Sequence, residues 1–313
     1  MTIVLRNARR LARHATLSYV TLAAAYVLLI FILPPSHTTM RLYHMTSLQY
    51  KTVLLLVSIP SLIVWLAAFM GYIRLRLYAD SVSESEDGRH FSRLASGAAW
   101  LAWSLPVTAL LILVLNGFAN RWPAWHPASI IVGNYAVLLP VLIAFTMIGG
   151  AARSLLQSAQ VRISLSATRL IMFFFAAAGV LYCYLVFRNL DLSSLGASQN
   201  PFFLPVWLLV VTLIVPYIYA WLVGVLAAYE ITLFSNNAGG LLYRRALRLL
   251  AVGLVAVIAG SIALQYIGGV HPGASYLVLD GRLLAVTIFR LISGAGFLLL
   301  ARGADKLKRI EEV

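Results

Sequence analysis

Eight long apolar stretches, each about long enough to cross a lipid bilayer, divide this chain of 313 residues. They lie near residues 17–34, 52–74, 95–117, 128–150, 169–188, 202–228, 247–268 and 283–302. A transmembrane helix needs about 20 mostly apolar residues. Continuous apolar runs are typical of helices, whereas barrel strands alternate apolar and polar residues. The sequence therefore predicts an all-α integral membrane protein with eight transmembrane helices.

The composition leaves little material for a water-exposed domain. Hydrophobic residues make up 61% of the chain and charged residues 11%, against roughly 25% charged residues in a typical soluble domain. The longest connection expected, between the second and third spans, covers about 20 residues. We therefore expect residues 1–313 to form a single transmembrane domain.

The basic residues alternate from one side of the predicted membrane to the other. Five segments (the two ends of the chain and the connections after spans 2, 4 and 6) hold 18 of the 24 Lys and Arg residues, and the four intervening segments hold five. Lys and Arg accumulate on the cytoplasmic side of membrane proteins. The pattern predicts a multi-pass protein of a bacterial or archaeal cytoplasmic (inner) membrane with both termini cytoplasmic. It also accounts for the net charge of +14 without a nucleic-acid partner, so the expected partner is the lipid bilayer.

The two halves of the chain resemble each other. At a shift of 152 residues, spans 1, 3 and 4 match spans 5, 7 and 8, for example at Phe145 and Phe297, while spans 2 and 6 match at a shift of 156, where Pro60 and Trp65 meet Pro216 and Trp221. Chance matches among Leu, Ala and Val are the alternative. The pattern favours two parallel four-helix repeats, residues 1–152 and 153–313, related by a pseudo-twofold axis along the membrane normal, with a groove between them.

No catalytic constellation is visible in the spans. All ten acidic residues fall in predicted loops or at span ends, and no His-Glu-x-x-His motif or phosphate-binding loop occurs. The single cysteine, Cys183, permits no intramolecular disulfide and no cysteine-based metal site. We therefore expect no enzymatic activity and no cofactor.

Arg290 is the strongest single-residue signal. It lies eight residues after Arg282, about 12 Å deeper in the membrane at 1.5 Å per residue. An arginine at such depth costs roughly 2.5–3.5 kcal/mol to insert, so it is expected to face protein or water. An anion contact in a cavity is the functional interpretation; bonds to helix carbonyls, or a side chain reaching outward to Asp280, are the structural one.

Further candidate residues are weaker. Asn134, Tyr135 and Gln265 could line the same substrate site as Arg290, although interhelical hydrogen bonds are their commoner use. His37, Met40, His44 and Met45 in the first outer loop form a weak candidate site for a soft cation such as Cu(I), against which Arg41 counts.

Prolines and small residues indicate how the helices are shaped and packed. Helix kinks are expected at Pro60, Pro106, Pro140 and Pro216. Close helix contacts are expected at Ala67-x-x-x-Gly71, Gly224-x-x-x-Ala228 and Ala256-x-x-x-Gly260. The acidic run 80–88 can cap the following helix or pair with nearby arginines.

Two functions of different classes remain open. One is a transporter or permease for a small solute or lipid-like anion, using Arg290 and a cavity between the repeats. The other is a non-catalytic scaffold or sensor subunit of a larger membrane complex, which would co-purify with a membrane-protein partner. A homo-oligomer is the further assembly left open. The lack of intramembrane acids and the short loops fit both.

Overall fold

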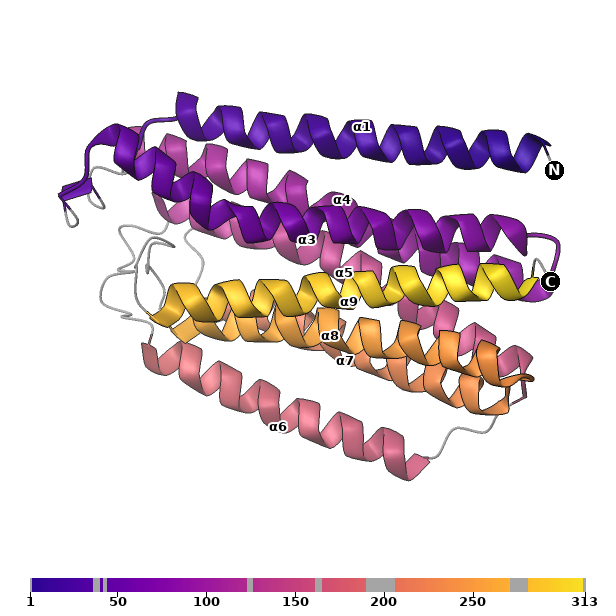
Figure 1. Ribbon diagram of the computed structural model, residues 1–313. Coiled ribbons are helices and arrows are strands. Elements are labelled where there is room, and N and C mark those ends of the chain that lie inside the picture. Colours follow the sequence, from indigo (N-terminus) through magenta and orange to yellow (C-terminus); the bar gives the residue numbers. More distant parts are fainter. Residues whose placement is uncertain are drawn as a thin grey trace.

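The computed structural model describes residues 2–35, 40–41, 44–122, 126–160, 165–189, 206–270 and 281–311 (Figure 1). Within these residues the fold is all-helical, with eight helices and no strand. The helices are α1 (Thr2–Ile32), α3 (Ser47–Ser81), α4 (Glu86–Arg121), α5 (His126–Ser158), α6 (Leu165–Asn189), α7 (Val206–Asn237), α8 (Leu241–Val270) and α9 (Gly281–Glu311). They lie side by side in an elongated bundle, and both termini lie at one end of it, called here the terminal end (Figure 1).

Seven of these helices are long and apolar enough to cross a membrane. They are α1, α3, α4, α5, α7, α8 and α9, and the membrane-spanning segment in each is 23 to 35 residues long. In α6 the apolar segment found within the described residues is shorter, Ser166–Leu181. The prediction of a multi-pass helical membrane protein is therefore supported, with seven clear spans.

The turn between α3 and α4 is much shorter than the expected connection of about 20 residues, because only residues 82–85 separate the two helices. The polar residues on either side of this turn, which follow the second predicted span and precede the third, are part of α3 and α4. Arg76 pairs with Asp80 one turn later at 3.0 Å, and the Ser85 side chain accepts a hydrogen bond from the Gly88 amide as the N-cap of α4. The expected capping and arginine pairing of the acidic run are confirmed.

Helices α3 and α9 pack side by side and run in the same direction. A Cβ atom added to Gly294 would lie 3.3 Å from the Val64 side chain, and further along both helices Arg74 meets Asp305 at 3.0 Å. Since both residue numbers increase together, the two helices are parallel. Helix α9 is therefore joined to the N-terminal half of the chain through α3.

Helices α5 and α7 also pack in parallel. The Tyr135 and Thr212 hydroxyls are hydrogen-bonded near one end, and Arg153 meets Glu230 near the other. The remaining close pairs, α3 with α4, α4 with α5, α7 with α8 and α8 with α9, join helices that follow each other in the chain. Helices α3, α5, α7 and α9 therefore link the two halves of the chain.

Glycines bring α8 and α9 into close contact. A Cβ atom on Gly253 would lie 2.7 Å from the Gly296 carbonyl oxygen, and one on Gly296 would lie 2.6 Å from the Gly253 carbonyl oxygen. Neither position can hold a larger residue without a backbone shift. The glycines of the predicted small-residue motifs also lie in close helix contacts: Gly71 faces Phe297, Gly224 faces Phe145 and Gly260 faces Ser293.

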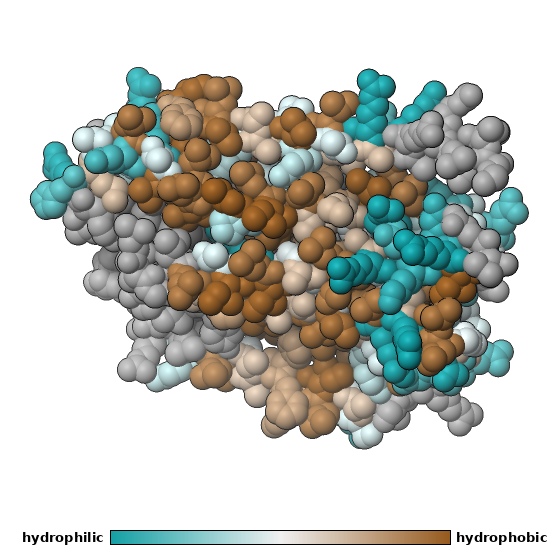
Figure 2. Space-filling model, in the orientation of Figure 1, coloured by the Kyte–Doolittle hydropathy of each residue, from teal (hydrophilic) through white to brown (hydrophobic). Residues whose placement is uncertain are grey.

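Helices α1 and α6 lie on opposite sides of the bundle (Figure 1). Helix α1 packs on α3 and α4, and α6 packs on α7 and α8. The outer face of α6 is strongly apolar, with Phe173, Phe174 and Val180 more than 60% exposed. Apolar side chains cover much of the visible face of the molecule (Figure 2), as expected for a surface that contacts lipid tails.

All four prolines of interest lie inside continuous helices, Pro60 in α3, Pro106 in α4, Pro140 in α5 and Pro216 in α7. Each removes one backbone donor from its helix. The kinks themselves stay predictions.

Candidate functional site

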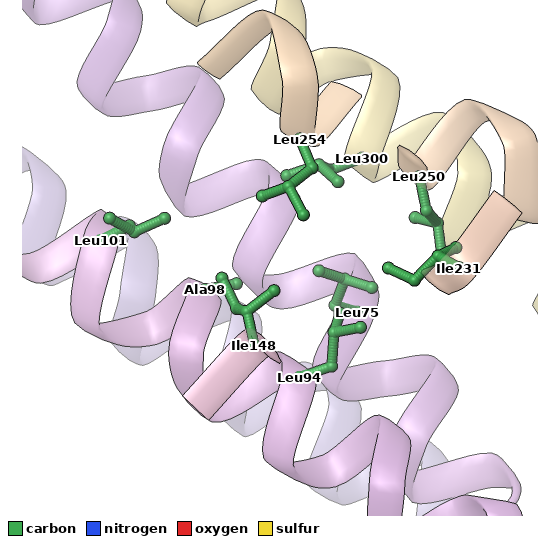
Figure 3. Close-up of a pocket in the computed structure, with 9 residues that line it drawn as sticks. All are labelled: Leu75, Leu94, Ala98, Leu101, Ile148, Ile231, Leu250, Leu254 and Leu300. Carbon is green, nitrogen blue, oxygen red and sulfur yellow. The ribbon is translucent and has the colours of Figure 1, made fainter. Parts of the chain in front are cut away.

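The centre of the bundle is packed with apolar side chains. A small void lies there, and its lining comes from six helices, α3, α4, α5, α7, α8 and α9 (Figure 3). The lining residues are Leu75, Leu94, Ala98, Leu101, Ile148, Ile231, Leu250, Leu254 and Leu300. No polar side chain lines this void, so in the described structure it offers no hydrogen-bonding group to a polar ligand.

Two ion pairs connect the halves of the chain toward the terminal end. Arg74 on α3 lies 3.0 Å from Asp305 on α9, and both side chains are partly exposed. Arg153 on α5 lies 3.5 Å from Glu230 on α7. In both pairs the arginine comes from residues 1–160 and the acid from the later part of the chain.

Glu230 is the acidic side chain that sequence reasoning misplaced. We expected it at the end of a span, but it lies inside α7 and only 5% of its side chain is exposed. A buried carboxylate is costly unless it is paired, and Arg153 supplies the charge. The sequence does contain a sign of this burial. Glu230 comes two residues after the predicted span, and the residues that follow it, Ile231-Thr232-Leu233-Phe234, are again mostly apolar, so the buried helix can be expected to continue past Glu230.

An aromatic cluster lies at the same level between the halves. The rings of Tyr78 and Phe91 meet edge to face, 4.8 Å between centroids, and the side chain of Tyr243 on α8 lies close enough to Tyr78 to interact with it. Tyr78 is almost fully buried. Together with the two ion pairs, this cluster adds contacts between helices of the two halves toward the terminal end.

Arg290 lies on the flank of α9 that faces α3. It precedes Gly294, which faces Val64 of α3, by four residues, and Phe297, which faces Gly71 of α3, by seven. At about 100° per residue these spacings place both residues within about 40° of Arg290 around the helix. Arg290 is half-buried and therefore lies at the contact between the two halves of the chain.

The structure does not bring the candidate residues together in one described site. Tyr135 is hydrogen-bonded to Thr212 of α7, which is the interhelical use expected as the alternative. The side chains of Asn134 and Gln265 lie outside the described residues, so their grouping with Arg290 stays a prediction.

The structure does not test the predicted metal site. His37 lies outside the described residues. The Met45 amide donates a hydrogen bond to the Met40 carbonyl, 3.0 Å, and the His44 amide donates one to the Arg41 carbonyl, 3.4 Å. Among the residues that the structure describes, no group of three or more His, Cys, Asp or Glu could hold a metal ion. The cation site at this loop therefore stays a prediction.

Comparison with known proteins adds no assignment, because no protein-family model, no curated protein and no solved structure matches this chain.

Proposed function

We propose that this chain is an eight-helix transporter or permease of the cytoplasmic membrane, built from two four-helix repeats, that moves a small solute or lipid-like anion along the junction of its halves. Arg290 is the residue proposed to contact the anion. The observation that carries the proposal is the position of this arginine, deep in an apolar helix on the flank of α9 that faces α3.

The direction of the helices supports the eighth crossing. Helices α5 and α7 run in parallel, so the chain must return across the bilayer between them. Helix α6 is the segment available for this return; its 25 residues extend about 37 Å at 1.5 Å per residue, enough for the hydrocarbon core of about 30 Å. It also runs alongside the other helices in the bundle (Figure 1).

The helix contacts support the repeat. Under the proposed correspondence of α1, α3, α4 and α5 with α6, α7, α8 and α9, the α3–α9 contact is equivalent to the α5–α7 contact, and every other close pair also has a counterpart. Matched positions have similar burial, as Trp65 and Trp221 do, and Phe145 and Phe297. The void also fits a pseudo-twofold axis, since Leu75 and Ile231 are matched positions on its wall.

A transport cycle fits this architecture because, in the described residues, the void between the halves is lined by apolar side chains. The apolar centre can separate without breaking a buried polar network, and the two ion pairs with the Tyr78 cluster form a closure at the terminal end. Separation of the halves at that end would expose the α3–α9 junction. Arg290 would then attract an anion entering from the lipid or from water.

Flux measurements in proteoliposomes test this function. The probes are fluorescent phosphatidylglycerol, followed by its reduction with dithionite, and radiolabelled inorganic phosphate. We expect flux of one probe above empty liposomes, at least a tenfold loss in Arg290→Leu, and retention in Arg290→Lys because the charge is kept. Equal flux in wild type and Arg290→Leu would remove the role proposed for this residue.

The scaffold or sensor subunit is the second candidate, and the wholly apolar lining of the central void favours it. Native mass spectrometry of the protein extracted gently from its own membrane separates the two. A stoichiometric protein partner, with no flux of either probe, would support the scaffold or sensor function. A lone chain or homo-oligomer would support transport.

A further inference from the structure

We propose that the open groove between α3 and α9 binds an anionic phospholipid in the leaflet on the side of the two termini. The acyl chains would lie along apolar stripes of both helices, and the phosphate would lie among Arg74, Arg302, Lys306 and Arg309. This inference goes beyond transport, because a lipid can bind here whether or not it is moved.

The apolar part of the groove follows from exposed residues at helical spacing. On α3, Leu56, Ile59, Ile63, Leu66 and Met70 are exposed, and on α9, Leu284, Ile288, Leu291 and Leu298 are exposed. At about 100° per residue each set spans less than one third of its helix circumference. The two stripes flank the line along which the helices touch, so they border one groove open to lipid.

The polar part of the groove continues the same helix faces. Arg74 follows Met70 by one turn on α3. On α9, Arg302 follows Leu298 by one turn, and Lys306 and Arg309 continue its exposed face. Hydrophilic side chains gather at this end of the visible face, beyond the apolar surface (Figure 2). The order along both helices, apolar and then basic, matches the order of acyl chain and headgroup in one leaflet.

Charge complementarity selects an anionic lipid over a neutral one. The four basic side chains of the groove are accompanied by one acid on α9, Asp305, which is already paired with Arg74 at 3.0 Å. A phosphodiester would add the missing negative charge, and each Lys or Arg near a membrane surface favours anionic lipid. Long basic side chains can also extend their stems over apolar surface while the charged group reaches the phosphate.

The equivalent groove, between α5 and α7, carries less unbalanced positive charge. Its own arginine, Arg153, pairs with Glu230, and Arg93 of α4 reaches Gly150 from outside the two helices. The positions matching Arg302, Lys306 and Arg309 are Gly150, Ser154 and Gln157, which carry no charge. The position matching Arg74 is Glu230, which is buried. A basic belt produced only by membrane orientation would not distinguish the two grooves, so the difference points to a site.

Binding is tested on the full-length protein in nanodiscs of phosphatidylethanolamine with added phosphatidylglycerol, with retained lipid counted by native mass spectrometry. Wild type is expected to retain phosphatidylglycerol in preference to phosphatidylethanolamine. The double variant Arg302→Gln/Lys306→Gln should bind it about 10–30-fold more weakly. The matched control Arg89→Gln/Arg93→Gln removes the same charge from the exposed start of α4 and should bind as wild type does.

The charge-preserving variant Arg302→Lys/Lys306→Arg should also retain the lipid, and the single variants Arg302→Gln and Lys306→Gln should each lose part of the binding. An equal loss in the α4 control would overturn the proposal, because binding would then follow net charge alone. Displacement of the lipid by soluble glycerol phosphate at the same concentration would also overturn it, since the acyl groove would contribute nothing. Because only binding is measured, a failure here leaves the flux result for Arg290 unaffected.

Discussion

Arg153 and Glu230 form an ion pair across the junction of α5 and α7, with 3.5 Å between Nε and Oε1, although 77 residues separate them in the chain. Their environments differ sharply, because the side chain of Glu230 is 5% exposed and that of Arg153 is 62% exposed. Arg153 therefore stabilises the fold mainly because it keeps the buried Glu230 carboxylate from being an unpaired charge in the protein interior. Its attraction through water contributes less.

Replacing Arg153 with methionine should therefore destabilise the folded protein. The variant leaves the buried Glu230 carboxylate without its partner, and we expect a loss of about 1–3 kcal/mol in the free energy of unfolding. Adding Glu230→Gln should recover part of this loss. Thermal unfolding in nanodiscs measures both, with Arg89→Met, at the exposed start of α4, as the control that removes a surface arginine. A loss no larger than in this control would contradict the buried-charge argument.

The pair formed by Arg74 and Asp305 predicts a different behaviour, because both side chains are partly exposed. Water and ions screen such a pair, so a double-mutant cycle should give a coupling of about 0.2–1 kcal/mol. Arg74→Asp should cost more than Arg74→Ala, since it places two carboxylates together. The exchanged variant Arg74→Asp/Asp305→Arg should regain most of the stability. Equal stability of Arg74→Asp and the exchanged variant would show that the pair contributes nothing.

The two ion pairs also influence which halves of the chain can pack together. Both arginines lie on helices of the first four-helix group, α3 and α5, and both acids lie on helices of the second, α7 and α9. If two first halves met through the same surfaces, arginine would face arginine, and two second halves would bring acids together. Like charges at an interface act against the wrong partner. The arrangement therefore favours pairing of a first half with a second half over pairing of identical halves.

Gly296 should tolerate no added methyl group. In Gly296→Ala the new Cβ would lie 2.6 Å from the Gly253 carbonyl oxygen, a backbone atom that can move only with its helix. We expect a loss of roughly 1–3 kcal/mol, as for other overpacked sites, read from the thermal unfolding midpoint. Gly239→Ala is the matched control, because no atom lies within 4 Å of its added Cβ. A midpoint unchanged in both variants would mean that α8 and α9 are not in close contact.

Local sequence patterns predicted the helices well because each apolar span forms its own backbone hydrogen bonds. They underestimated helix length, since hydropathy falls at Arg74 and Arg76 while the helix continues through the Arg76–Asp80 pair. They could not predict that Arg74 meets Asp305, 231 residues away, because that contact depends on how the halves dock. The insertion cost of Arg290 predicted that it faces protein or water, and its contact with an anion stays a prediction, whereas Tyr135 proved to bond to Thr212.

The proposed crossing of α6 can be measured by cysteine labelling. In a Cys183→Ser background, single cysteines at Glu84, Gln160 and Ser198 report the connections after α3, α5 and α6. If α6 crosses the membrane and the termini are cytoplasmic, a membrane-impermeant maleimide should label Ser198→Cys in intact cells, and the other two only after permeabilisation. Labelling of Gln160→Cys and Ser198→Cys from the same side would contradict the crossing. It would also conflict with the parallel contact of α5 and α7, because two helices that run in the same direction across a bilayer need a returning segment between them.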